Sequence, residues 1–339
     1  MRAAVLVAQK QPLAIQDVVT PNVGSEQVLV RVRVCGICHT DISLMTDYPL
    51  RKLPPLILGH EIAGDIERAP NGTGFKKGDR VLVRWTITCR ECDFCREGRE
   101  NLCEKIKAVG IDQDGGFAEF VSVPLDNVTK IPDKLKYEEG ALAAEALGTS
   151  YKAIKKAQIQ PDTYVAIFGL GGLGIPACNI ISKLRGAKVI AVDILEEKLE
   201  FARRYGADFL VNGSSSDPME KIREITGGKG ADMAFEFVGR KESMENAVKS
   251  VRKGGKVMIV GATANPFSVN PFRIFREEVE ITGSYGSTKK DVKELLDLLE
   301  RDQIRTDGLI SGRCSLEEIN KQVDTIRREK NIIRSLVSI

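Results

Sequence analysis

The spacing of hydrophobic and polar residues divides the chain into two regions of different texture. In residues 28–34 (VLVRVRV), apolar and charged side chains alternate, which predicts a half-exposed strand. Gly and Pro are frequent through the first ~145 residues, as expected where many turns join short strands. We therefore predict an irregular, β-rich first domain.

Beyond residue 150 the pattern changes to strands alternating with helices. Six apolar runs begin 20 to 25 residues apart: YVAIFG, KVIAVD, DFLVN, DMAFEFVG, KVMIVG and VEITGSYG. Amphipathic segments such as EEKLEFARRYGA lie between most of them. This spacing predicts a parallel, doubly wound α/β sheet. The last ~50 residues start with a predicted helix and end in a strand-like LVSI, and they either form a separate piece or return to the first domain.

Composition and charge exclude several classes of partner. The chain is 42% hydrophobic and 29% charged, as in ordinary globular proteins. The net charge is +3, from 50 basic and 47 acidic residues without a long basic run, so no nucleic-acid partner is expected. No stretch approaches the ~18 continuous apolar residues of a membrane span. The N-terminal apolar stretch is too short for a secretion signal, so we expect a cytoplasmic protein.

Four of the eight cysteines form a compact motif, Cys89-x2-Cys92-x2-Cys95-x7-Cys103. In a reducing cytosol, such clustering favours metal binding over disulfides. Zinc takes four tetrahedral thiolates, and a closed four-thiolate set leaves no position for substrate, so this zinc should be structural. An iron–sulfur cluster is the alternative, which the x7 gap disfavours. The cations expected to offset the −2 charge are Arg90, Arg96, Arg99 and Lys105.

A glycine-rich turn follows the first of the six apolar runs. The glycines are Gly169, Gly171, Gly172 and Gly174, in a strand–turn–helix context that suits the pyrophosphate of a dinucleotide. Asp193 ends the next predicted strand, where it can accept both ribose hydroxyls and would repel a 2′-phosphate. Ile194 and Leu195 follow it, where an NADP enzyme often carries Arg. The turn therefore predicts NAD as the cofactor.

A second set of metal ligands lies near the N-terminus. The chain has only two histidines, His39 and His60, and Cys38 and His60 are good zinc ligands. Two ligands from separate segments plus a third would leave the fourth position open to substrate. The remaining cysteines are predicted to be structural, Cys35 as a small apolar residue in its strand: Cys35, Cys178 and Cys314.

Taken together, GICHTD, GHE, the four-cysteine motif and FGLGGLG followed by Asp193 resemble the zinc-containing alcohol dehydrogenases of the medium-chain dehydrogenase/reductase family. The motifs come in the family's order and cover nearly the whole chain. The resemblance implies a GroES-like catalytic domain (1–147), a Rossmann domain that binds NAD (148–287) and a return to the first domain (288–339). It places the active site between the domains. The run VEITGSYG resembles the family's dimerising edge strand, which implies a homodimer or homotetramer.

The resemblance also implies roles for residues around the second zinc ion. Cys38 and His60 are ligands, and Glu61 is an acidic neighbour that can approach the metal. Where the family usually has a cysteine as third ligand, this sequence has Glu145. The other predicted roles are the proton relay from the substrate hydroxyl (Thr40), the carboxylate partner of the histidine ligand (Asp41), the relay terminus in place of the usual histidine (Ser43) and an aromatic wall of the substrate pocket (Trp85).

For the cofactor, the resemblance assigns His39 and Arg334 to the pyrophosphate and Lys198 to the adenosine ribose. Thr149 and Leu173 match positions near the nicotinamide. The expected activity is reversible hydride transfer between a small-molecule alcohol and NAD, with two zinc ions per chain.

Related activities remain as alternatives. Glu145 also suits a threonine, polyol or sugar dehydrogenase. A non-enzymatic zinc- or nucleotide-binding relative, or an enoyl reductase, is disfavoured by the presence of Cys38, His60, Thr40 and Asp41 together.

Overall fold

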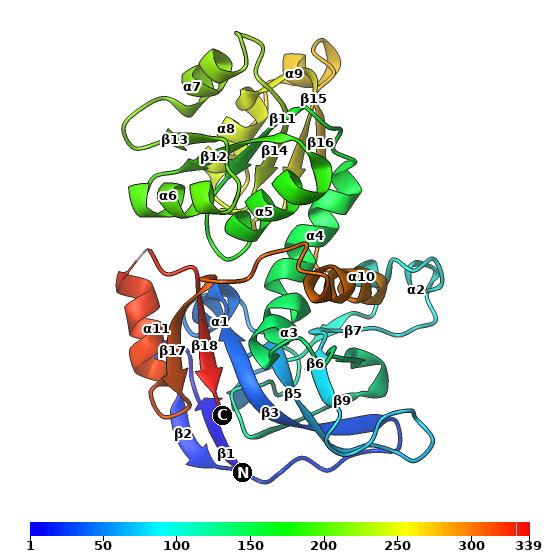
Figure 1. Ribbon diagram of the computed structural model, residues 1–339. Helices are drawn as coiled ribbons and strands as arrows, with labels where there is room; N and C mark the ends of the chain where they lie inside the picture. Colours follow the sequence, from blue (N-terminus) through cyan, green and yellow to red (C-terminus); the bar gives the residue numbers. More distant parts are fainter. Residues whose placement is uncertain (330) are drawn as a thin grey trace. The chain divides into compact units, whose positions relative to one another are not determined.

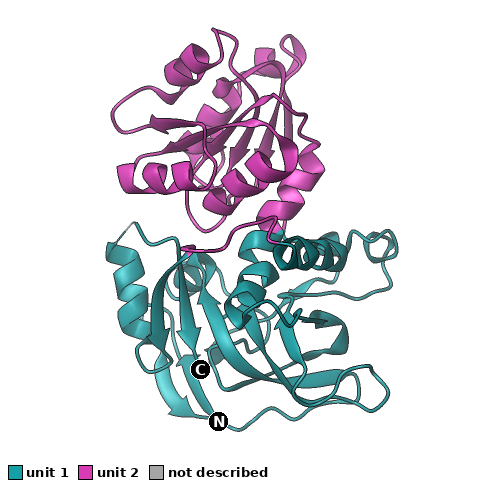
Figure 2. Ribbon diagram, in the orientation of Figure 1, with its two compact units in different colours: residues 1–148, 286–301, 310–339 teal, residues 149–285, 302–309 magenta. Residues whose placement is uncertain are grey.

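The computed structural model describes residues 1–329 and 331–339 and divides the chain into two compact units (Figures 1 and 2). Unit 1 comprises Met1–Gly148, Gly286–Arg301 and Ile310–Ile339, and unit 2 comprises Thr149–Tyr285 and Asp302–Leu309. The first division lies one residue beyond the boundary expected from the sequence.

Residues 302–309 belong to unit 2, although the sequence assigned all of 288–339 to the first domain. Two hydrogen bonds explain this difference. The backbone N–H of Arg305 donates to Asn179 Oδ1 at 2.9 Å, and the Tyr205 hydroxyl donates to the carbonyl of Asp307.

Unit 1 is built around the long strand β3 (Gln27–Ile37), as the alternating pattern predicted. Val28, Val30, Val32 and Val34 are buried, whereas Arg33 is exposed. The sheet order is β10-β6-β5-β3-β18-β17, with β9 also paired to β3. These strands are β5 (Glu61–Arg68), β6 (Arg80–Val83), β9 (Phe120–Pro124), β10 (Val128–Lys130), β17 (Ile310–Ser315) and β18 (Arg334–Ser338).

The C-terminal strand β18 runs antiparallel to β3, with Ser335 opposite Ile37. The end of the chain thus lies in unit 1, beside the strand that leads to Cys38. This pairing brings segments that are far apart in the sequence to one edge of the candidate site.

Smaller elements complete unit 1. The sheet β2-β1-β4 and the pair β7-β8 comprise β1 (Arg2–Leu6), β2 (Ala14–Asp17), β4 (Leu56–Ile57), β7 (Thr86–Ile87) and β8 (Lys107–Ala108). The helical segments are α1 (His39–Leu44), α2 (Asp93–Arg96), η1 (Glu100–Leu102), η2 (Leu125–Asn127), α3 (Tyr137–Ala144), α10 (Lys289–Glu300) and α11 (Ile319–Arg328). Helix α4 (Ala146–Ala157) begins in unit 1 and continues into unit 2.

Unit 2 contains the parallel sheet predicted from the apolar runs, in the order β13-β12-β11-β14-β15-β16. Its strands are β11 (Tyr164–Phe168), β12 (Lys188–Asp193), β13 (Phe209–Asn212), β14 (Ala231–Glu236), β15 (Val251–Ile259) and β16 (Glu280–Gly283). Its helices are α5 (Gly174–Arg185), α6 (Glu196–Arg204), α7 (Pro218–Ile225), α8 (Lys241–Ser250) and α9 (Pro271–Phe275). The strand order reverses beside β11, the position where such sheets bind dinucleotides. The α/β fold class is confirmed.

Among the described residues, the structure shows no helix with both the length and the apolar character needed to cross a membrane.

Candidate metal centres and dinucleotide site

Four potential metal ligands meet inside unit 1: Cys38, His60, Glu61 and Glu145. One ligand atom from each lies within 4.8 Å of the others. Cys38 follows the end of β3, His60 and Glu61 stand at the start of β5, and Glu145 follows α3. The fold thereby collects, from three separate segments, the donor set that the sequence predicted for the second zinc ion.

Asp41 fixes the two segments that carry Cys38 and His60. One carboxylate oxygen accepts the backbone N–H of Cys38 at 2.9 Å, and the other accepts that of Gly59 at 3.1 Å. The second oxygen also lies 3.2 Å from Nδ1 of His60. Burial opposes protonation of this imidazole, but Asp41 and Cys38 together outweigh burial and raise the pKa of His60 well above its usual value. This contact leaves Nε2 of His60 as the nitrogen that can bind a metal.

Glu61 is fully buried, and it depends on a glycine that the sequence reasoning did not single out. Gly36 is its register partner on β3. A Cβ atom at Gly36 would lie 1.9 Å from Oε2 of Glu61. Any side chain at position 36 would displace the carboxylate, so the glycine of GICHTD makes room for the acidic residue of GHE. The register of β3 against β5, which a single sequence does not show, is the signal that would have revealed it.

Arg334 lies with the ligands, at the start of β18. Its Nη1 atom is 2.9 Å from Glu61 Oε1, and its Nη2 atom is 3.8 Å from Glu145 Oε2. The side chain is only 6% exposed. Its predicted contact with a pyrophosphate stays a prediction, because its described contacts are to these carboxylates.

The charges of the buried group leave room for a divalent cation. Burial and Glu145 raise the pKa of the Cys38 thiol, but His60 and the Arg334 guanidinium outweigh them and lower it. In the protonation state that metal binding requires, with Cys38 as thiolate, His60 neutral and both carboxylates ionised, three negative groups face the Arg334 guanidinium, a sum of −2. Burial raises the pKa of Glu61 well above its usual range, and Arg334 only partly opposes this. Uncompensated buried charge of this kind is costly, and a zinc ion would balance it.

The backbone turns at Glu145, where α3 ends and α4 begins. Its φ of −139° and ψ of −69° are not helical. This break directs the carboxylate toward Cys38 and His60, within the 4.8 Å group, instead of leaving it on the helix surface. The geometry supports a ligand role for Glu145 over that of a surface acid.

The other residues predicted near the substrate lie around this group. The Thr40 hydroxyl is 3.7 Å from Cys38 Sγ, close enough to meet a substrate held there. Trp85 is 9% exposed, and its ring lies edge-on to His60 with centroids 6.2 Å apart. Ser43 donates its hydroxyl hydrogen bond to the backbone carbonyl of His39, which is itself exposed in α1.

The four-cysteine motif forms the second metal group. Sγ of Cys89 lies 3.5 Å from that of Cys103 and 3.9 Å from that of Cys95, and the Cys92–Cys95 separation is 3.6 Å. Zn–S bonds of about 2.3 Å give tetrahedral S–S edges of about 3.8 Å. Within the described residues all eight cysteines are free of disulfides. The sulfurs therefore fit one zinc ion.

Of the positive charges beside this motif, Lys105 acts on the sulfurs, since Glu91 and then the Cys89 and Cys103 sulfurs raise its pKa. Each cation pairs with a surface carboxylate: Arg90 with Glu26, Arg96 with Asp93, Arg99 with Glu97 and Lys105 with Glu91. Backbone N–H groups take over part of the expected role. Those of Glu91 and Cys92 lower the pKa of Cys89 to about 6. Compensation of the motif's charge by Arg90, Arg96 and Arg99 stays a prediction.

The glycine turn of unit 2 has the geometry of a dinucleotide site. Gly169 has a φ of +91°, and a Cβ at Gly174 would lie 1.9 Å from the Gly169 carbonyl. A Cβ at Gly171 would meet nothing within 4 Å, so the backbone there is open to a ligand. The turn leads directly into α5, whose first N–H groups suit an anion.

Asp193 at the end of β12 supports the same turn. Its carboxylate accepts the N–H of Leu170 at 2.7 Å and those of Ile194 and Leu195 at 2.8 and 3.1 Å. Burial lowers the pKa of Lys198 on α6, and Asp193 opposes this. Asp193 and Lys198 thus act on each other electrostatically, and their shared ribose role stays a prediction.

The residues predicted near the nicotinamide also lie in unit 2. Thr149 is buried in α4, and its neighbour Ser150 donates a hydrogen bond to the Leu173 carbonyl at 2.8 Å. Leu173 directly precedes α5. Ser150 therefore ties the helix that carries Thr149 to the residue before α5.

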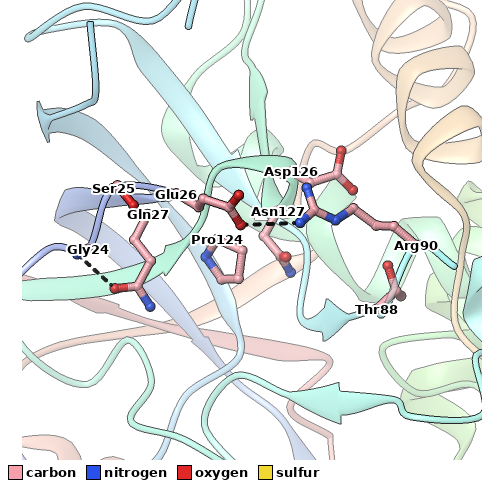
Figure 3. A pocket seen from close by; sticks show the side chains of 9 residues that line it. All are labelled: Gly24, Ser25, Glu26, Gln27, Thr88, Arg90, Pro124, Asp126 and Asn127. Atoms are coloured by element: carbon pink, nitrogen blue, oxygen red, sulfur yellow. Dashed lines mark hydrogen bonds and ion pairs between the residues drawn. The ribbon is translucent and has the colours of Figure 1, made fainter.

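A cavity of about 450 Å³ lies elsewhere, in unit 1 (Figure 3). It is lined by residues 24–27, Thr88, Arg90, Pro124, Asp126 and Asn127, and it includes none of the metal ligands. The exposed pair Glu26–Arg90 borders it at 3.4 Å. Because no metal-binding residue lines it, this cavity is not a candidate site for the dehydrogenase reaction.

Comparison with known proteins identifies a domain of the same family in each of the two units. Residues 24–133 match the alcohol dehydrogenase GroES-like domain, and residues 172–301 match the zinc-binding dehydrogenase domain. An alcohol dehydrogenase of Geobacillus stearothermophilus is 40% identical over 327 residues, covering 96% of this chain and 95% of that protein.

Two further relatives extend over the whole chain. An NAD-dependent alcohol dehydrogenase of Sulfurisphaera tokodaii is 33% identical, with 99% of each chain covered. The crystal structure of the alcohol dehydrogenase from Aeropyrum pernix superimposes with a TM-score of 0.92, at 33% identity and full coverage of both chains.

A GroES-like unit with two zinc-type donor sets and a Rossmann unit with a dinucleotide turn define a zinc- and NAD-dependent dehydrogenase. The chain belongs to the zinc-containing alcohol dehydrogenases of the medium-chain dehydrogenase/reductase family.

Proposed function

We propose that this protein reversibly transfers a hydride between a small primary or secondary alcohol and NAD, with one catalytic and one structural zinc ion per chain. The observation that carries the proposal is the buried meeting of Cys38, His60, Glu61 and Glu145 within 4.8 Å. When bound, zinc supplies a Lewis acid that lowers the pKa of the substrate hydroxyl, and NAD accepts the hydride.

The chain's own residues position the reactants and move the proton. Cys38, His60 and Glu145 are the proposed metal ligands. Glu61, paired with Arg334, is the acidic neighbour that can exchange with them. Thr40 accepts the proton of the substrate hydroxyl and passes it on, with Ser43 at the end of the path. Asp41 keeps Nδ1 of His60 engaged, so that Nε2 faces the metal.

NAD is proposed to occupy the turn of Gly169, Gly171, Gly172 and Gly174, with the adenosine ribose at Asp193 and Lys198. His39 and Arg334 are the proposed pyrophosphate contacts, and Thr149 and Leu173 the nicotinamide contacts. Open backbone at Gly171 and the position of the turn directly before α5 support this placement.

The second candidate is a polyol, threonine or sugar dehydrogenase, which is favoured by Glu145 as a carboxylate ligand. Trp85 against His60 argues for plain small alcohols, because a bulky wall narrows the space beside the metal. The family resemblance at β16 supports a homodimer or homotetramer, and the clustering of four cysteines in a metal-binding spacing suits a cytoplasmic enzyme.

The test has two parts. Metal analysis of the purified protein should give about two zinc ions per chain. A screen of alcohols, diols, threonine and aldoses with NAD, followed by NADH absorbance, should give the highest kcat/KM for small alcohols. A zinc-replete protein that reduces NAD with none of these substrates would overturn the proposal, and a preference for diols, threonine or aldoses would select the second candidate.

A further inference from the structure

The backbone around Trp85 is held by one buried side chain, that of Asn127. Asn127 ends η2 and is 2% exposed. Its Nδ2 atom donates to the carbonyl of Arg84 at 2.8 Å and to the carbonyl of Thr86 at 2.8 Å. The two acceptors stand on either side of Trp85, so one amide group fixes the chain before and after the indole.

Backbone hydrogen bonds complete this support. The carbonyl of Asn127 accepts the N–H of Arg84 at 2.8 Å, and the carbonyl of Trp85 accepts the N–H of Val109 at 2.9 Å. Arg84 and Trp85 lie between β6 and β7, outside regular strand pairing, so these two residues rely on these contacts, whereas Thr86 begins β7. Both donors of the Asn127 amide are used on it, and no other residue type of similar size offers two such donors.

The Arg84 side chain is also locked. It is 2% exposed and lies 3.3 Å from Asp126 and 3.8 Å from Glu100. Asp126 is the neighbour of Asn127, and Glu100 belongs to the segment between Cys95 and Cys103. The residue before Trp85 is therefore tied both to η2 and to the four-cysteine motif.

On the other side, the indole faces the candidate catalytic group. Its ring lies 6.2 Å from the His60 ring at an interplanar angle of 62°. A Cβ at Gly286 would lie 3.2 Å from Trp85 Cζ2, so the indole is closely packed there as well. A small shift of the 84–86 backbone would move a wall of the space beside His60.

We propose that Asn127 is a positioning residue that sets substrate size by clamping the Arg84–Thr86 backbone, and with it the indole of Trp85 against His60. The inference rests on the proposed alcohol dehydrogenase function only for its effect on substrate choice. Asn127 itself lies beside the polar cavity of Figure 3 and acts through Trp85.

Trp85 is the only tryptophan of the chain, so the tryptophan fluorescence of the protein reports directly on the surroundings of this indole. In Asn127→Ala we expect tryptophan emission at longer wavelength and stronger acrylamide quenching, with zinc content unchanged. The ratio of kcat/KM for cyclohexanol over ethanol should rise about tenfold, since pocket contacts of this size are worth such factors. Asn127→Ser, which keeps one donor, should fall between wild type and Asn127→Ala in both readouts.

Asn179→Ala is the matched control, because it removes another buried asparagine that accepts a backbone N–H far from Trp85 in the sequence. It should lower stability and leave emission and the cyclohexanol-to-ethanol ratio as in wild type. If Asn127→Ala lowers only the melting temperature, with wild-type emission and substrate ratio, the proposal is wrong. Should Asn127→Ala not fold, Asn127→Ser decides by the same readouts. If the wild-type protein oxidises no alcohol, the proposed function fails while emission and quenching still decide the clamp.

Discussion

The two metal groups of unit 1 are built in opposite ways. Cys89, Cys92, Cys95 and Cys103 come from one segment of fifteen residues, held in part by backbone N–H groups such as that of Cys92 on the Cys89 sulfur. The buried group instead draws on residues 38, 60, 61 and 145 and places Arg334 among them. One segment can wrap an ion by itself, whereas the buried group exists only when β3, β5, α3 and β18 are all in place.

This difference indicates what each group can do. Four thiolates make a closed shell, which suits a structural role. The buried group has a mixed donor set and a second carboxylate, that of Glu61. Glu61 is paired with Arg334, so it is available as an alternative metal ligand. A mixed and adjustable set leaves a position for substrate, which suits chemistry.

Removing a ligand from the buried group should have the largest effect on activity. Cys38→Ala should lower kcat/KM by about 10³-fold or more, because the Lewis acid supplies several kcal/mol of transition-state stabilisation. Zinc content should fall from about two to about one per chain. Cys314→Ser, at a cysteine outside both groups, is the control and should keep both ions. A variant that retains two zinc ions and full turnover would mean that Cys38 is not a ligand.

Replacing Glu145 tests the unusual third ligand. Glu145→Ala should lower kcat/KM and zinc affinity by about 10²-fold, since a direct ligand should matter at least as much as the outer partners that cost 10–100-fold. Glu145→Cys should restore zinc binding, because thiolate and carboxylate carry the same charge. Glu138→Ala, in the first turn of the helix that ends before Glu145, is the matched control. Wild-type zinc affinity in Glu145→Ala would leave Glu61 as the third ligand.

The contrast between the groups also explains what could be predicted from sequence. The four-cysteine motif and the dinucleotide turn could be predicted from their spacing, because each motif lies within one short segment of the chain. The strands of unit 2 were predictable because its central apolar runs are buried over most of their length in a parallel sheet.

What depends on distant pairing could not be predicted from one sequence. The space that Gly36 leaves for Glu61 follows from the register of β3 against β5. The position of Arg334 follows from β18 pairing with β3. Asn127 gave no signal, because its function is to bond carbonyls of a segment 41 residues away.

Asp41 tests whether the buried group depends on its surroundings. Asp41→Asn keeps the shape but weakens the contacts to Cys38 N, Gly59 N and His60 Nδ1. We expect a loss of about 10–100-fold in catalytic zinc affinity or in kcat/KM. Asp47→Asn, at an exposed acid paired with Lys10, should change neither quantity. Equal metal affinity in Asp41→Asn and wild type, measured by chelator competition, would show that the His60 contact is dispensable.

The four-cysteine group should give the smallest effect on chemistry and a separate effect on stability. Cys95→Ser opens the closed shell, and because metal binding contributes to folding free energy, the melting temperature should fall by several degrees. Zinc content should again drop by about one, but kcat/KM at a temperature well below melting should stay within about tenfold of wild type. We attribute any loss of kcat/KM within this range to the ion pair between Glu100, in the four-cysteine segment, and buried Arg84, which precedes Trp85. Zinc analysis, thermal unfolding and steady-state kinetics on one preparation separate these effects, with Cys314→Ser as the control. If Cys95→Ser lost activity as completely as Cys38→Ala while still folded and retaining one zinc ion, the division between a structural and a catalytic group would be wrong.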